Sequence, residues 1–415
     1  MKIGFFTSIE GWGGSETYLL TLMKGIRKAG HVPVLFGIEG TRLFRDARDV
    51  EIECVAWKRI SQGEEVASVG TGDTPHLNPL PQVERKGGAP GRILRELKKA
   101  TLFLIPGWLK LLVGNAREVL TLRRVFARHR VDVMHVSNSG YEVAGIACKL
   151  CNIPSLVMNM ITPPPEPNRV RRWLMKNTLR GYGHISSQSR NCTEAWIRFA
   201  DLQPKRCSFV WNGVDLSRFM EGGQRLRRVD DPFKVVSLGR LHPMKGYRYL
   251  IEAVRMINDP RLKVDIYGEG EEEKVLQSLI RDLGIEGQVF LRGYIENPEE
   301  VLREADCFVL PAVSHESCPA VVPEAMACCL PVITSDFGPL PEININGETG
   351  IVTLARDVAT LADAIRTLMK DPALCDAMGR LGRSRVVACF TVDQMVAKLI
   401  GMYQKLGALS NGGEQ

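Results

Sequence analysis

Segments rich in Ile, Val and Phe alternate with helical segments from one end of this 415-residue chain to the other. A strand followed by a helix and then a further strand is typical of a parallel α/β sheet that helices cover. The pattern occurs twice, on either side of a polar break at 212–231 that contains Gly222 and Gly223. We therefore predict an α/β protein of two doubly wound, Rossmann-like domains.

Seven of the predicted strands belong to the first domain and six to the second. In the first they are 2–7, 32–37, 52–57, 133–137, 155–159, 184–187 and 208–211. In the second they are 234–238, 263–267, 288–292, 307–310, 331–334 and 350–352. We expect domains at 1–213 and 214–388, and an amphipathic helix at 389–408 that returns to the first domain.

The composition of the chain indicates in which cellular compartment the protein is found. No uninterrupted apolar run reaches the roughly 18 residues of a membrane span, so we predict no transmembrane helix. Glu10 and Glu16 follow the apolar start of the chain too soon for a signal peptide. The eleven cysteines are scattered and odd in number, which fits a reducing compartment. We expect a cytoplasmic protein.

The stretch 61–91 is rich in Gly and Pro, and we predict a disordered insertion there. Basic residues then dominate 92–130, and large apolar side chains, Trp108 among them, are mixed with them at 93–113. Such a stretch either contacts anionic lipid at the inner face of the cytoplasmic membrane or covers the core of its own domain. No nucleic-acid motif accompanies the charge, so we expect no nucleic-acid partner.

The first candidate site is a strand-to-helix turn in the second domain. Gly239 and Arg240 end a predicted strand, and Lys245 and Gly246 open the next helix. Ligands of doubly wound sheets bind outside the carboxyl ends of the strands. Arg and Lys at this place can hold a diphosphate. The alternative interpretation is a solvated basic helix start.

The second candidate site follows a later strand. Pro323 is tolerated only in the first turn of a helix, which places the helix start near Ala320. The turn of Ser317, Cys318 and Ala320 then offers backbone N–H groups to an anion. Glu324, one turn into the helix, can accept hydrogen bonds from vicinal hydroxyls such as those of a ribose. Glu316 lies across the turn, where it can meet a sugar.

Two further features of the sequence concern how an anionic ligand would be bound and neutralised. Gly11 to Glu16 is a glycine-containing loop that opens a helix, typical either of an anion site or of a tight turn. No Asp-x-Asp pair for a metal-bound diphosphate occurs in the sequence. Helix dipoles and the Arg240 and Lys245 pair would then neutralise the charge of a leaving group, and we expect no obligatory metal and no other cofactor.

Several of these motifs together resemble the group 1 (family 4) retaining glycosyltransferases. They are the run from Ser237 to Gly246, Glu316 and Glu324 with the Ala-Met-Ala that follows, Pro331-Val-Ile, Gly13-Gly14-Ser15-Glu16, Asn212-Gly-Val-Asp215 and Gly293-Tyr294-Ile295. The resemblance covers nearly the whole chain except about 60–115.

The resemblance implies a GT-B fold, in which two domains face each other across a cleft that holds the active site. It implies transfer from a nucleotide-diphosphate sugar, with retention, to a glycan or lipid-linked acceptor in cell-surface polysaccharide synthesis. The roles it implies are diphosphate contact by Arg240 and Lys245, ribose contact by Glu324, catalytic contact with the donor sugar by Glu316, base contact by the backbone of Tyr294 and Ile295, and close approach of Gly14 to the phosphates.

One position departs from the family pattern. Many members carry a histidine just past the strand that corresponds to 155–159, near the reacting sugar, and this chain has Met160 there beside Asn159. His135 on the preceding strand is a candidate substitute, so His135 and Asn159 are candidates for the acceptor side. The alternatives are a structural His135 and a non-catalytic partner subunit that binds a nucleotide sugar. A sugar-nucleotide epimerase of the same fold is a third hypothesis.

Overall fold

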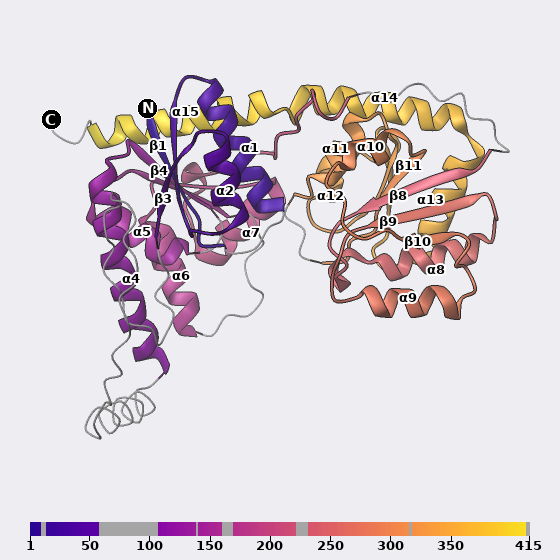
Figure 1. Cartoon of the computed structure of the whole chain (residues 1–415), viewed down its shortest axis with the longest axis horizontal. Coiled ribbons are helices and arrows are strands. Elements are labelled where there is room, and N and C mark those ends of the chain that lie inside the picture. The colour runs from indigo at the N-terminus through magenta and orange to yellow at the C-terminus, as the bar shows by residue number, and fades with distance from the viewer. Residues whose placement is uncertain are drawn as a thin grey trace, which may run out of the picture.

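The computed structural model describes residues 1–9, 14–57, 107–137, 140–159, 169–220, 231–314 and 318–411, without the side chains of 107–115, 159, 170–171 and 409–411. The predicted insertion at 61–91 lies outside these residues. Two parallel sheets with helices on both faces form two domains that lie side by side (Figure 1). The predicted fold class is confirmed.

The N-terminal domain contains a sheet of order β3-β2-β1-β4-β5-β6-β7 among the described residues. Its strands are β1 (Lys2–Phe6), β2 (Val32–Gly37), β3 (Glu53–Ala56), β4 (Val133–Ser137), β5 (Ser155–Asn159), β6 (His184–Ser187) and β7 (Cys207–Phe209). Its helices are α1 (Gly14–Lys28), α2 (Arg42–Asp49), α4 (Gly107–His129), α5 (Tyr141–Leu150), α6 (Arg169–Gly181), α7 (Arg190–Ala200) and the short η1 (Pro204–Arg206).

The C-terminal domain contains a sheet of order β10-β9-β8-β11-β12-β13. Its strands are β8 (Phe233–Leu238), β9 (Leu262–Tyr267), β10 (Val289–Leu291), β11 (Cys307–Leu310), β12 (Val332–Ser335) and β13 (Gly350–Thr353). The helices are η2 (Pro243–Lys245), α8 (Tyr247–Ile257), α9 (Glu273–Asp282), α10 (Pro298–Arg303), α11 (Val321–Ala327), α12 (Leu340–Ile343), α13 (Val358–Lys370) and α14 (Pro372–Cys389).

All the predicted strands are present, with ends that differ by at most two residues. They were visible in the sequence because strands buried on both faces are nearly continuous apolar runs. In the first sheet α1 and α2 pack on one face and α4 to α7 on the other. Among the described residues, no helix combines the length and the hydropathy that a membrane crossing needs.

The last helix, α15 (Val392–Asn411), packs in the N-terminal domain although it follows the second sheet. Leu399 and Tyr403 lie fully buried in one cluster with Ile3 and Phe5 of β1. In Figure 1, α14 and α15 (yellow) run one after the other along the same side of both domains. The chain therefore passes between the domains twice.

The two crossings are joined by backbone hydrogen bonds. The Val214 N–H donates to the Phe390 carbonyl oxygen at 2.7 Å, and the Val392 N–H donates to the Val214 carbonyl oxygen at 3.3 Å. A backbone pair at the crossing limits how far the domains can move apart without breaking hydrogen bonds. The polar break that the sequence places between the two domains begins two residues before Val214.

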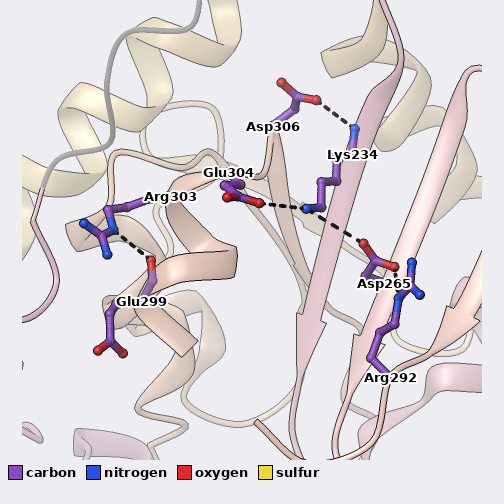
Figure 2. Close-up of polar contacts among 7 residues, drawn as sticks. All are labelled: Lys234, Asp265, Arg292, Glu299, Arg303, Glu304 and Asp306. Atoms are coloured by element: carbon purple, nitrogen blue, oxygen red, sulfur yellow. Dashed lines mark hydrogen bonds and ion pairs between the residues drawn. The ribbon is translucent and has the colours of Figure 1, made fainter. Parts of the chain in front are cut away.

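A network of charged side chains fastens the C-terminal sheet (Figure 2). The Lys234 ammonium group lies 3.5 Å from Glu304 and 4.0 Å from Asp265. Asp265 accepts a hydrogen bond from Arg292 Nε at 2.6 Å, and Asp306 accepts one from the Lys234 backbone N–H at 2.7 Å. The network connects β8, β9 and the ends of β10 and α10, so it holds the strands that carry the candidate site.

Candidate active site

Three turns at the carboxyl edge of the C-terminal sheet meet backbone to backbone. Gly239 follows β8 and Gly268 follows β9, with φ angles of 147° and 143° that favour glycine. A Cβ atom on Gly268 would lie 2.0 Å from the Gly239 carbonyl oxygen. The Gly268 N–H donates to the Gly293 carbonyl oxygen, after β10, at 2.7 Å. The turns therefore pack directly against one another, and only glycine fits at these two positions.

The turn between β8 and α8 brings Arg240 and Lys245 to this edge. Gly246, with φ 70°, packs so tightly that a Cβ atom would lie 2.1 Å from the Pro311 carbonyl oxygen at the end of β11. The Lys245 side chain lies across Gly239, because a Cβ atom there would be 3.5 Å from Lys245 Cε. Arg240 is exposed and Lys245 half-buried. The two cations thus flank the same glycine.

Helix α11 begins where the sequence placed it. Its N-cap is Ala320, and Pro323 lies in the first turn. Cys318, just before the helix, is buried, and Glu324 is half-buried in the first turn. Glu316 and Ser317 lie outside the described residues.

Glu324 lies in an environment that disfavours its charge. Burial raises the pKa of its carboxyl group to about 7, the Arg218 charge lowers it, and Glu299 raises it. Arg218 forms an ion pair with Glu299 at 2.9 Å. Figure 2 shows the Glu299 carboxylate directed away from Arg303, whose guanidinium donates to the Glu299 backbone oxygen at 3.1 Å. Glu324 therefore changes charge near neutral pH.

The segment after β10 meets the N-terminal domain. Tyr294 is 54% exposed, and Ile295 is half-buried against the core. Arg42, at the start of α2, forms an ion pair with Glu296 at 3.1 Å. A hydrogen bond to the Tyr294 side chain raises the pKa of the Arg42 guanidinium group. The predicted base-binding segment therefore lies at the interface of the two domains.

The start of α1 faces the same interface. Gly14 opens the helix, and a Cβ atom there would meet no atom of the described residues within 4 Å. One turn later, Tyr18 is buried and donates to the Met158 sulfur at 3.1 Å. Burial raises the pKa of the Tyr18 hydroxyl group, and nearby Cys318 raises it further. Tyr18 is thus close to Cys318, in the turn before α11.

His135 does not lie at this interface, which corrects its acceptor-side assignment. The side chain has no exposed surface, and its Nδ1 lies 2.7 Å from the Tyr403 hydroxyl oxygen on α15. Burial lowers the pKa of the imidazole to about 3, so the ring is neutral. His135 anchors the returning helix in the core. Asn159 is the last residue of β5 and pairs with Ser187 of β6. The Asn159 side chain and Met160 lie outside the described part of the structure.

Sequence reasoning missed the residues that connect the domains. They are Arg42, Gln188, Asn212 and Glu342. Asn212 lies in a motif that was recognised, but no role was assigned to its side chain. The partners of these residues are far away in the sequence, so no local pattern could have found them.

Two family models match the chain. The model of Glycosyltransferase Family 4 matches residues 12–218, and that of Glycosyl transferases group 1 matches residues 223–385. The two matches cover the two domains, one each. The chain belongs to the group 1 (family 4) glycosyltransferases, as the motifs predicted.

Curated relatives and solved structures agree with this placement. The glycogen synthase of Mycobacterium tuberculosis is 33% identical over 185 residues, which span 44% of each chain, so less than half of that relative is matched. An Escherichia coli UDP-Gal:alpha-D-GlcNAc-diphosphoundecaprenol alpha-1,3-galactosyltransferase is 24% identical over 70% of this chain and 80% of its own. Anabaena HepE in complex with UDP has a TM-score of 0.75 at 18% identity, covering 98% of this chain and 100% of its own. The last of these shows the shared fold.

The charge state of Glu324 can be measured directly by carbon NMR on protein labelled at the glutamate carboxyl groups. We expect one carboxyl resonance to titrate with a midpoint close to 7 and to be missing from Glu324→Gln. In Arg218→Met the midpoint should rise, because the cation that favours the carboxylate is gone. A midpoint in the ordinary carboxyl range near 4.5 would contradict the account.

Proposed function

We propose that this protein transfers a sugar from a nucleotide-diphosphate sugar to a glycan or lipid-linked acceptor, with retention at the anomeric carbon, in cell-surface polysaccharide synthesis. The observation that carries the proposal is the carboxyl edge of the C-terminal sheet. There Arg240 and Lys245 flank Gly239, and Glu324 lies in the first turn of α11. Cations that bind the diphosphate and a carboxylate that accepts from the ribose hydroxyls are what a nucleoside diphosphate requires.

Each group has a distinct part in the proposed chemistry. Arg240 and Lys245 bind the diphosphate and neutralise the charge that develops as the sugar departs. Ionised Glu324 accepts hydrogen bonds from the two ribose hydroxyls. The backbone of Tyr294 and Ile295 holds the base, at the place where Arg42 reaches across from the other domain.

The remaining assignments follow from the family pattern. Glu316 contacts the donor sugar, and the turn of Ser317, Cys318 and Ala320 lines the phosphate side. Gly14 approaches the phosphates from α1, and among the described residues no atom would lie within 4 Å of a Cβ atom there, which supports the assignment. The proposal requires no metal, because the two cations and the backbone N–H groups supply the positive charge.

The acceptor class is supported by the relatives. The Escherichia coli enzyme named above has a diphosphoundecaprenol-linked acceptor in its name, and so does a Campylobacter jejuni relative that is 26% identical over 49% of this chain. We propose a glycan or lipid-linked acceptor on that basis. The acceptor is presented by the N-terminal domain, opposite the donor.

Lys245→Ala tests the donor assignment. Loss of a charge-assisted contact should cost about 2–3 kcal/mol of binding free energy. This lowers kcat/KM for the nucleotide sugar by about 30- to 150-fold. The assay is release of nucleoside diphosphate from UDP-, GDP- and ADP-sugars, with membrane extract as the source of acceptor. Lys274→Ala, an exposed lysine on α9, is the matched control and should behave as wild type.

Two outcomes would contradict the proposal. If the wild type turned over none of these donors, the protein would not be a glycosyltransferase of this kind, and binding without turnover would indicate the non-catalytic subunit. If the wild type were active and Lys245→Ala equally so, Lys245 would not hold the diphosphate.

The membrane interaction of residues 92–130 remains a separate proposal. In the described part, Arg117, Arg124 and Arg128 are exposed on α4, and Leu120 between them is 50% exposed. Trp173 on α6 is 65% exposed. Figure 1 shows α4 projecting beyond the rest of the N-terminal domain. Basic residues beside exposed apolar side chains favour a surface of anionic lipid.

Flotation with liposomes tests this interaction. We expect binding to anionic vesicles that weakens at high salt, because exposed charges are screened. Trp173→Ala should lower the affinity by about fivefold or more through lost apolar burial, and deletion of 93–113 should lower it further. Leu381→Ala, which removes a side chain 52% exposed on α14, should have no effect. Equal binding of all variants would exclude this surface.

A further inference from the structure

The turn between β6 and α7 is a point where the N-terminal domain is bound to the C-terminal domain by polar contacts. It contains Gln188, the N-cap Ser189, and the first helical residues Arg190 and Asn191. Ser189 caps its own helix, since its hydroxyl oxygen accepts from the Cys192 N–H at 3.1 Å. The turn is therefore well fixed within its own domain.

The first contact is a relay of two amides. Gln188 Nε2 donates to Asn212 Oδ1, and Asn212 Nδ2 donates to the Cys318 carbonyl oxygen at 3.0 Å. The exposed fractions of the three residues are 2%, 6% and 5%, so water cannot easily replace these bonds. The relay runs in one direction, from the N-terminal domain to the residue that lies three positions before α11.

The second contact is a carboxylate at the helix end. Glu342 on α12 accepts from the Arg190 N–H at 3.0 Å with one oxygen and from the Asn191 N–H at 2.7 Å with the other. These are first-turn donors of α7 that have no partner within the helix, and the helix dipole favours a negative charge there. Glu342 therefore holds the same turn that begins the relay.

Both contacts bridge the two domains, so both require the domains to keep their present relative position. If the domains moved apart at this turn, the buried Cys318 carbonyl would lose the Asn212 donor, and two helix N–H groups would lose their acceptor. Leaving a buried polar group unpaired costs about 1–3 kcal/mol. Helix α11 itself is held in the C-terminal core through Val322, Ala325 and Met326. The relay thus fixes α11 relative to the other domain.

We propose that Asn212 is a positioning residue of the transfer reaction, which holds the entry to α11 in register with the N-terminal domain while Glu342 secures the turn. The inference rests on the proposed function. A donor held by the C-terminal domain must be brought against an acceptor held by the N-terminal domain, and small misplacements slow such a step strongly. Asn212 acts through the backbone of Cys318 and touches no substrate.

Asn212→Asp is the sharpest test. The carboxylate can still accept from Gln188, but it cannot donate to the Cys318 carbonyl. We expect kcat for sugar transfer to fall on the order of 10- to 100-fold. The affinity for the nucleoside diphosphate that binds the wild type best among UDP, GDP and ADP should fall much less than kcat, because Arg240, Lys245 and Glu324, the principal groups proposed to hold it, lie outside the relay. Transfer should fall more than hydrolysis of the nucleotide sugar.

Gln288→Glu is the matched control. It removes an amide that donates to the Asp259 and Leu262 carbonyl oxygens, at the amino end of β10 and away from the domain interface. It should lower the melting temperature while leaving kcat and the ratio of transfer to hydrolysis unchanged. If it changed that ratio as Asn212→Asp does, the effect would be one of stability and the proposal would be wrong.

A second variant keeps the proposal testable if Asn212→Asp does not fold. Glu342→Ala changes a half-buried side chain and should lower kcat with nucleotide affinity retained. Glu342→Gln keeps one acceptor oxygen for one of the two N–H groups, so it should recover only part of the loss. An active wild type with unchanged kcat in these variants overturns the inference alone. A wild type that turns over no nucleotide sugar overturns the proposed function, and the inference with it.

Discussion

Close contact between backbone turns at the carboxyl edge of the second sheet is the constraint on which the site depends. Gly246 lies against the Pro311 carbonyl, and Gly268 lies against that of Gly239, with no room for a side chain at either place. These contacts draw together the ends of β8, β9 and β11. Arg240 and Lys245 on one turn, and Glu324 on the helix after β11, therefore share one edge of the sheet.

The electrostatics of that edge follow from its packing. Burial would keep Glu324 protonated, while the Arg218 charge opposes that effect. Arg218 follows the segment where the chain first passes between the domains. Its guanidinium charge acts on the Glu324 carboxyl group. Arg42 reaches the segment after β10 from the other domain. The proposed donor site is thus built by the C-terminal domain and bordered by groups that depend on domain arrangement.

The sequence predicted most of the fold because its signals are local. Strands buried on both faces appear as apolar runs, and Pro323 restricts where α11 can begin. The same locality explains the failures. His135 was a candidate for the acceptor side, with a structural role as the alternative, and its partner Tyr403, 268 residues away, makes it a core residue. Glu342 binds the start of α7 from about 150 positions further along the chain.

A crystal structure of the protein with a bound nucleoside diphosphate, chosen from UDP, GDP and ADP by thermal stabilisation, tests the central claim most directly. The account predicts the diphosphate within hydrogen-bonding distance of Arg240 and Lys245, and the ribose hydroxyls on the Glu324 carboxylate. A nucleotide bound elsewhere, with Glu324 making no contact to the ribose, would contradict it.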